Sequence, residues 1–504
     1  MSTTNTRPPI IRAVRVRPTV KALALGCLLF SGCSDDDGDS NLGGSAGSQD
    51  ASAGGSSLSE AGPESASSGS GGTSGSGGTS GSGGTSASGG ASGSGGTSAS
   101  GGSGGSGGAS QPVCGDGLCD KTETAGNCPA DCAPCQPLPP NATPIEKLLY
   151  ELPPDTWYEM PNTPMRAVCP PKSEVGGVGD CEMVVRAWGG GALDTKRNRL
   201  ILWGGGHNDY WGNELYAFEV ATGTWKRLTD PSKGTVTNQD PLPDGNPVSR
   251  HTYDGIDYVH HADVLFAQGG SRASDGGGTD VTWTFDFVTS AWTNHAPDPK
   301  GPGGYCIATA YDPNSKSIFA RSTKNLYIYD LESNVWTPLV GFGYTPLWPR
   351  YERWGDKTGT VDPKRHLFWS VGNGDILVWS IDEKKLVTED WVTTGGGDYS
   401  NAGYVKGYPE QLFESGGGAV YNVDAPGFDY DVQADALVGW PNAGSPYVLD
   451  LTTKIWEKGS DQGAPTSKTS GGTYGRFRYI PAYNVFILVV SVDKNVFFYK
   501  NRGC

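Results

Sequence analysis

Two short segments of this chain carry the residue types that proton-transfer chemistry needs. Residues 202–218, LWGGGHNDYWGNELYAF, place His207 and Asn208 between two apolar runs, in a chain with 6 histidines among 504 residues. The second segment, SRHTYDG, contributes three more such side chains: Arg250, His251 and Tyr253. Imidazole and phenol groups can take and give protons, and guanidinium groups bind carboxylates. The two segments together predict a site for an acidic molecule.

The elements that must position these segments are short strands that repeat along the chain. Runs of aromatic and β-branched residues with a period of two are bounded by Asp, Pro and Gly, a pattern that indicates strands joined by tight turns. Four copies have an aromatic residue nine positions before a closing tryptophan: ELYAFEVATGTW at Trp225, VTWTFDFVTSAW at Trp292, NLYIYDLESNVW at Trp336 and PYVLDLTTKIW at Trp456. DILVWSIDEKKL, which ends at Leu386, is a weaker copy.

These repeats predict an all-β propeller over residues 137–504, because four-stranded antiparallel units of this length are propeller blades. The glycine pair, the aromatic residue and the closing tryptophan resemble the Kelch repeat of galactose-oxidase-like propellers, over roughly residues 150–504. The repeats predict six blades, and a seventh could lie between Trp391 and Gly418. Such a resemblance specifies the fold far better than the function.

The two ends of the propeller are expected to share one blade. The last copy, NVFFYKNRGC, stops before any outer strand, whereas DTWYEMPNT, residues 155–163, supplies a lone strand with a tryptophan. We therefore expect residues 155–163 to pair with the strand around Val496–Tyr499 and to close the ring.

The segment before the propeller predicts export and anchoring. Residues 1–32 join a basic leader to the apolar run ALALGCLLF, which is the pattern of a signal peptide. FSGC resembles the bacterial lipoprotein cleavage box, which implies lipidation of Cys33; Ser34 implies an outer-membrane destination in the cell envelope. Residues 33–111, rich in Gly, Ser and Thr, predict a disordered tether. The membrane is expected to be contacted through Cys33 only.

A cysteine-rich module is predicted at residues 112–136. Five cysteines within CGDGLCDKTETAGNCPADCAPC predict disulfides in an exported chain, and the segment resembles short cysteine repeats of myxobacterial surface proteins. Asp116 and Asp120, which lie among the cysteines, could hold a structural calcium ion; a solvated acidic surface is the alternative. No other cofactor is expected.

Three further disulfide expectations concern the propeller. Cys169 and Cys181 bracket a glycine-rich loop and are expected to bond. Cys504, at the end of the last blade, is expected to pair with Cys135, which leaves Cys306 as a buried thiol.

The blade pattern predicts that the two chemical segments meet. LILWGGG is expected to be a second strand and NELYAFEV a third, so His207 and Asn208 lie in the connection between them. In an antiparallel blade this connection lies on the same face as the start of the next blade's innermost strand, predicted to be SRHTYDG. His207, His251 and Tyr253 are therefore the predicted catalytic residues.

Several polar side chains, most of them arginines, are predicted to point toward the same end of the propeller channel, the mouth, and to bind the ligand there. A shift of 64 residues aligns Arg186 with Arg250 and Asn208 with Arg272. Two further segments, PRYERW and GRFRY, add the remaining candidates: Arg350, Tyr351, Arg353 and Arg476. The alternative is that carboxylates of the blades pair with these arginines one by one.

The composition of the chain limits which classes of partner are expected. The formal net charge is −16 and the sequence lacks a basic footprint, so nucleic acid is not expected as a partner. A monomer that acts on an acidic, uronate-containing polysaccharide is expected, as a lyase working by β-elimination. In that mechanism Arg250 and Asn208 hold the uronate carboxylate, His207 or His251 takes the C5 proton, and Tyr253 serves as the acid.

Two other functions remain open from the sequence. A non-catalytic module that binds glycan or protein would suit the aromatic loops such as GFGYTPLWPRYERW. A copper oxidase like galactose oxidase would need two tyrosines, two histidines and a tyrosine-linked cysteine. Cys306 follows Tyr305, but no histidine lies beyond His366, which disfavours this alternative.

Overall fold

The computed structural model shows the propeller region. It describes residues 137–207, 209–234, 238–323, 325–341, 356–391, 417–466 and 471–502. The predicted signal peptide, the tether, the cysteine-rich module and residues 503–504 lie outside these ranges, and with them Cys33, Asp116 and Asp120.

Six four-stranded antiparallel sheets make up the described part of the chain, which confirms the six-bladed propeller. The first blade contains β2 (Gly191–Asp194), β3 (Arg199–Leu202), β4 (Tyr216–Glu219) and β5 (Thr224–Arg227), and the second contains β7 (Ile256–Val259), β8 (Val264–Gln268), β10 (Thr282–Asp286) and β11 (Ala291–Asn294). The third contains β12 (Ala308–Asp312), β13 (Ser317–Arg321), β14 (Asn325–Asp330) and β15 (Val335–Gly341).

The other three blades have the same order of strands from the channel outward. The fourth contains β16 (Thr358–Asp362), β17 (Leu367–Gly372), β18 (Asp375–Ser380) and β19 (Lys385–Leu386), and the fifth contains β20 (Gly427–Asp431), β21 (Ala436–Trp440), β22 (Tyr447–Asp450) and β23 (Ile455–Lys458). The sixth contains β24 (Phe477–Ile480), β25 (Val485–Leu488), β26 (Val496–Lys500) and β1 (Thr156–Met160).

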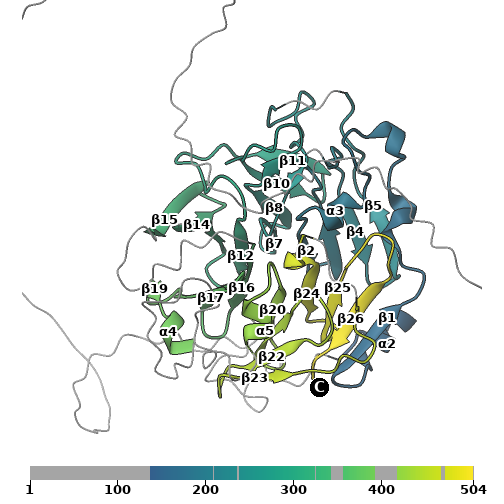
Figure 1. Ribbon diagram of the computed structural model, residues 1–504, viewed down its shortest axis with the longest axis vertical. Helices are drawn as coiled ribbons and strands as arrows, with labels where there is room; N and C mark the ends of the chain where they lie inside the picture. Colours follow the sequence, from purple (N-terminus) through teal and green to yellow (C-terminus); the bar gives the residue numbers. More distant parts are fainter. Residues whose placement is uncertain are drawn as a thin grey trace, which may run out of the picture. The chain divides into compact units, whose positions relative to one another are not determined.

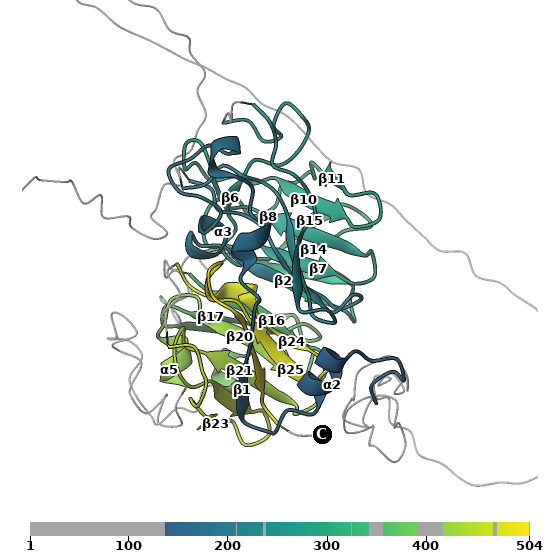
Figure 2. The same ribbon diagram turned by 90° about the vertical axis from the view of Figure 1, so that its right-hand side faces the viewer.

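The innermost strands form a ring around a central channel. Each one contacts the innermost strand of the next blade, from β2 through β7, β12, β16 and β20 to β24 and back to β2 (Figure 1). We call the side on which these strands begin the front face and the side on which they end the back face. In Figure 2, α3 (Met183–Arg186), α5 (Gly418–Tyr421) and β6 (Arg250–His251) lie on one side of the ring, which is the front face, and α2 (Pro144–Tyr150) lies on the other.

The remaining described elements are short. Besides α4 (Thr388–Trp391) and the strand β9 (Ser271–Arg272), which pairs with β6, there are three 3-10 turns: η1 (Met165–Val168), η2 (Lys172–Glu174) and η6 (Tyr474–Arg476). Among the described residues, no helix combines the length and the apolar composition that are needed to cross a membrane.

The first hairpin of a blade has a recurring turn on the back face. A buried aspartate at the end of the innermost strand accepts hydrogen bonds from amides of the turn, and a residue with positive φ closes it. In the fourth blade, Asp362 accepts from the amides of Lys364 and Arg365, and His366 has a φ of 54°. Carboxylates favour such turns because they satisfy backbone donors that the sheet leaves unpaired. The same turn aspartates occur in three other blades: Asp194, Asp312 and Asp431.

The predicted ring closure is confirmed. β1 pairs antiparallel with β26, in a register that places Trp157 opposite Tyr499. Trp157 is 6% exposed; its ring centroid lies 4.9 Å from that of Tyr499 and 6.5 Å from that of Trp440 in the fifth blade. Its Nε1 donates to Ser460 O at 3.1 Å. The N-terminal strand therefore joins the last blade and also packs against its neighbour.

The structure decides two of the cysteine expectations. Cys169 and Cys181 are bonded, as predicted. The prediction of a free thiol at Cys306 is wrong, because Cys306 is disulfide-bonded, to a partner outside the described residues. The sequence could not indicate this, since the pairing of distant cysteines depends on the tertiary structure.

Replacing Trp157 by alanine is expected to lower the free energy of unfolding by about 3 to 5 kcal/mol, because the change removes a buried aromatic ring at the ring closure. Urea unfolding measures this, with Ile455→Ala, at a 51% exposed outer-strand position, as the control. Equal losses in the two variants would contradict a special role for the closing strand.

The His366 imidazole is expected to make stability depend on pH in the alkaline range. Its hydrogen bond to Asp312 at 3.0 Å, supported by Asp382 at 2.6 Å, raises the pKa of His366 to about 9. The stabilisation is complete below the unfolded pKa of about 6.5 and is lost as the pH rises through the folded value. Because the side chain is partly exposed, we expect roughly 1 to 2 kcal/mol.

Urea unfolding of the wild type and of His366→Gln near about pH 6 and about pH 10 tests this expectation. The difference between the two proteins should shrink at the higher pH. A difference that is the same at both pH values would refute it.

Candidate functional site

We call the front end of the channel the front-face mouth. It is lined by residues at one backbone position, which recurs just before the innermost strand of a blade. Among the described residues, five of these positions have φ between 42° and 56°: Trp188, Tyr253, Cys306, Ala425 and Tyr474. Left-handed backbone is uncommon for residues other than glycine and must be held by its surroundings. The five residues come from five blades yet pack in one cluster, so they lie where the blades converge.

Backbone hydrogen bonds hold these positions from blade to blade. The Tyr253 amide donates to Trp188 O at 2.7 Å, and the Ala425 amide donates to Asp356 O at 2.9 Å. The Tyr474 amide donates to Ala425 O at 3.4 Å. The side chains at the mouth are therefore fixed by the ring itself and do not depend on a single loop.

The two predicted catalytic histidines meet at this mouth. His207 lies in the connection between β3 and β4, as predicted, and His251 lies in β6. Their ring centroids are 5.2 Å apart, edge to face at 84°. His251 Nε2 lies 2.9 Å from Asp209 Oδ2, so the first blade's carboxylate contacts the second blade's imidazole. One ligand atom from each of His207, Asp209 and His251 lies within 4.8 Å of the others.

The third predicted catalytic residue lies beside them. The Tyr253 ring is 6.0 Å from that of His251, at 90°, and 6.3 Å from that of Tyr474. The structure thus brings the three predicted residues together, from two connections of neighbouring blades.

Neighbouring residues fix the orientation of both imidazoles. The Trp188 ring lies 5.0 Å from that of His251. His207 packs on Gly276, where an added Cβ would come within 2.2 Å of the imidazole Cδ2. Tyr305 holds that glycine loop in place, because its hydroxyl donates to Gly276 O at 2.8 Å. A glycine is required here both for space and for its φ of 71°.

Burial shifts the proton equilibria of the site. It lowers the pKa of His207, and the nearby His251 lowers it further. It raises the pKa of Tyr253 well above its usual value, with the Asp356 charge as the second cause, so the phenol keeps its proton. Burial also raises the pKa of Asp356, whose Oδ1 lies 3.0 Å from Cys306 Sγ, to about 7. Tyr253 is thus in the form that can donate a proton.

Arg250 does not face the channel as predicted. It lies in β6 outside the innermost strand β7, is 1% exposed, and forms an ion pair with Asp240 at 2.6 Å. It also donates to Gly269 O at 3.1 Å and lies over the Trp203 ring at 5.3 Å. A guanidinium that is desolvated and paired in this way stabilises the loops and is not available to a ligand.

Arg476 is likewise structural, contrary to the prediction that it binds ligand. It is fully buried and donates to the carbonyl oxygens of Gly189 at 2.8 Å and Val489 at 2.6 Å, and to that of Gly472. Burial lowers the pKa of Arg476 to about 9. Its five N–H groups serve to satisfy backbone that the ring leaves unpaired.

The other two predicted binding arginines that the structure describes, Arg186 and Arg272, have different surroundings. Arg186 is not at the start of an innermost strand as predicted; it ends α3, is 59% exposed and forms an ion pair with Glu182 at 3.2 Å. Arg272, in β9, is a quarter exposed, forms an ion pair with Asp275 at 2.9 Å and lies next to the glycine loop under His207. Arg272 is therefore the predicted cation that stays near the site. The remaining candidates, Asn208, Arg350, Tyr351 and Arg353, lie outside the described residues.

Sequence reasoning assigned no role to Trp188 or Tyr474. It placed Asp209 on the shared face without a role, and it considered Asp356 only as an ion-pair partner of the arginines and Tyr305 only in the copper-oxidase alternative. A signal for three of them existed. Trp188, Asp356 and Tyr474 occur seven residues before the first hairpin turn of their blades, the position that Tyr253 has in its own blade. Aligning the copies on that turn would have placed them at the mouth.

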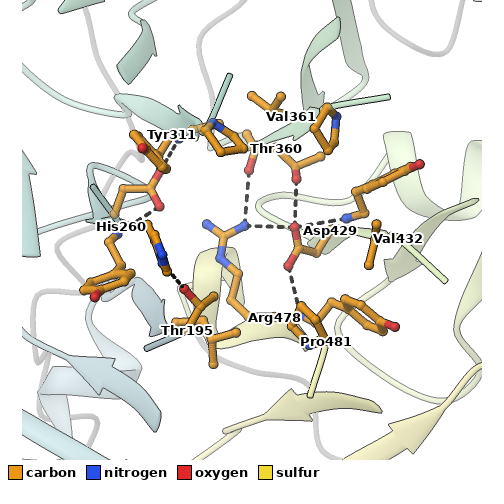
Figure 3. Close-up of a pocket in the computed structure, with 18 residues that line it drawn as sticks. Thr195, His260, Tyr311, Thr360, Val361, Asp429, Val432, Arg478 and Pro481 are labelled. Atoms are coloured by element: carbon orange, nitrogen blue, oxygen red, sulfur yellow. Dashed lines mark hydrogen bonds and ion pairs between the residues drawn. The ribbon is translucent and has the colours of Figure 1, made fainter. Parts of the chain in front are cut away.

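The back end of the channel holds a cavity of about 410 Å³ lined by all six blades. Figure 3 shows Arg478 pointing into it, with Asp429 beside it. Asp429 accepts from the Tyr479 amide at 2.8 Å and from Thr360 Oγ1 at 2.7 Å, and Arg478 lies 3.4 Å from Asp254. These polar groups connect one blade to the next, so we place the functional site at the front face.

Comparison of the chain with models of known protein families and with curated proteins finds no significant match. The six-bladed fold therefore rests on the structure, and the Kelch resemblance remains a prediction.

Replacing Gly276 by alanine is expected to displace the His207 imidazole, because the new methyl group would overlap it. The imidazole resonances of His207 in a ¹H–¹⁵N spectrum report the displacement. Gly444→Ala is the matched control, since Gly444 has a similar φ of 69° and nothing within 4 Å of an added Cβ. Both variants carry backbone strain of about 1 kcal/mol, and only Gly276→Ala should shift His207. Unchanged His207 signals in that variant would contradict the packing.

Proposed function

We propose that the front-face mouth binds a uronate-containing polysaccharide and cleaves it by β-elimination. The observation that carries the proposal is the convergence of His207, His251 and Tyr253 from two blades. The His251 ring lies 5.2 Å from the His207 ring and 6.0 Å from the Tyr253 ring. A group that can accept a proton beside a group that can donate one is what this reaction requires.

The reaction divides between the two kinds of side chain. The imidazole side of the cluster takes the C5 proton of the uronate, and the electron pair of that C–H bond forms the C4=C5 double bond. The C4–O bond breaks, and its oxygen receives a proton from Tyr253, whose phenol is protonated in the free protein. Holding both groups against one sugar ring replaces a three-body encounter by a single bound complex.

The uronate carboxylate must be met by positive charge, because the C5 proton is otherwise too weakly acidic. Arg250 and Arg476 cannot supply this charge, since both are buried and occupied. Arg272 is partly exposed beside the glycine loop and is the arginine that we assign to binding the polymer.

The test is an assay of the full chain on polymers of galacturonate, of glucuronate and of mannuronate with guluronate, in which the absorbance of new unsaturated ends is followed. Tyr253→Phe and His251→Gln are each expected to lower the rate about 10²- to 10⁴-fold. His295→Gln is the control, because His295 bonds to Thr284 in the outer strands of the second blade, at 2.7 Å.

Binding without products would replace this proposal by a glycan-binding module, and isothermal titration with the same polymers measures that outcome. A chain that neither binds nor cleaves any uronate polymer would overturn both.

A further inference from the structure

We infer that His207, Asp209 and His251 form a binding site for one divalent transition-metal ion of the zinc or manganese class. The inference stands on the donor set and its placement. Two imidazole nitrogens and one carboxylate oxygen converge within 4.8 Å at the mouth. Three protein ligands of these types, with further positions open, are the ligand pattern of catalytic zinc and of other divalent ions in enzymes.

The distances suit an ion after a small adjustment. Bonds of about 2.0 to 2.2 Å place neighbouring ligand atoms roughly 3 to 3.5 Å apart. His251 Nε2 and Asp209 Oδ2 are already 2.9 Å apart, so an ion could replace the hydrogen that they share. The ligand atoms lie within 4.8 Å of one another, so His207, which lies on the connection between β3 and β4, would have to approach the other two by about 1 to 1.5 Å.

The ligands differ in exposure in the way that a site open to solvent requires. The His251 side chain is 3% exposed and held against Trp188, whereas the Asp209 side chain is 33% exposed. One side of the cluster is thus anchored in the ring and the other faces the mouth. An ion held there would keep its remaining coordination positions toward a ligand.

A comparison with His366 separates this cluster from an ordinary ion pair. His366 has one carboxylate at each ring nitrogen, Asp312 and Asp382, an arrangement that favours a protonated imidazole. At the mouth the arrangement differs, because the imidazoles of His207 and His251 lie together with the carboxylate of Asp209, whose Oδ2 is 2.9 Å from His251 Nε2. That set offers a cation two imidazole nitrogens and one carboxylate oxygen as ligand atoms.

The role of the ion in the reaction rests on the proposed function. A divalent ion at the mouth would add to the positive charge of Arg272 that faces the uronate carboxylate, since the buried Arg250 does not face it. The imidazoles would then act through the ion, whose bound hydroxide would take the C5 proton and become water, while Tyr253 keeps its role as the acid. The metal site itself is independent of this reaction.

Isothermal titration of the metal-stripped full chain with Zn²⁺, Mn²⁺ and Ca²⁺ tests the site without substrate. We expect one zinc-binding event that His251→Ala, His207→Ala and Asp209→Asn each weaken at least about 100-fold. His295→Ala is the control for the loss of a histidine elsewhere, and thermal unfolding checks that each variant folds. Co²⁺ absorbance of the wild type should show ligand bands that the three variants lack.

Zinc binding that the three variants leave unchanged would place the metal elsewhere, and an absence of binding would equally overturn the inference. Failure of the metal site and failure of the lyase proposal can be told apart. Zinc bound at these residues without any unsaturated product would reject only the reaction. Product formation that persists in chelator, together with an absence of zinc binding, would reject only the metal.

Discussion

The pairing of β1 with β26 is the contact on which the rest of the molecule depends. A propeller is stable when every blade has neighbours on both sides, and here the last blade would lack its outer strand without residues from the N-terminal side. Trp157 strengthens the closure because it contacts Tyr499 in its own blade and Trp440 in the fifth blade. Since β24 also contacts β2, closing the last blade fixes the positions of the first two, which carry the candidate site.

The ring also determines where the functional side chains point. Positions such as Trp188 and Tyr253 have left-handed backbone before the innermost strand, and a hydrogen bond joins one to the other. Because this arrangement recurs from blade to blade, side chains from distant parts of the sequence reach the same mouth. The backbone strain is borne by the ring, so each blade can vary the residue that it presents there. An aromatic pair, a cysteine and a carboxylate thereby become neighbours.

The two ends of the channel differ in how their polar groups are satisfied. At the back end, carboxylates such as Asp429 accept amides of the next blade, and Arg478 lies between carboxylates. Those groups stabilise the contacts between blades. At the front end, the imidazole rings of His207 and His251 lie 5.2 Å apart, and the carboxylate of Asp209 contacts His251. The front face is therefore the end of the channel at which we propose chemistry.

The sequence by itself determined the elements that are local: the period-two strands, the blade repeat, the outer strand supplied by residues 155–163 and the Cys169–Cys181 bond. It also placed His207, His251 and Tyr253 on one face, because alternation of strand direction fixes which turns share a face. Only the tertiary structure decided whether each arginine side chain is buried in an ion pair or exposed to solvent. A long side chain can turn toward solvent or inward, and the choice depends on acceptors that other loops bring, such as Asp240 for Arg250. Contacts of that kind are set by packing between blades, and no repeat pattern along the chain encodes them.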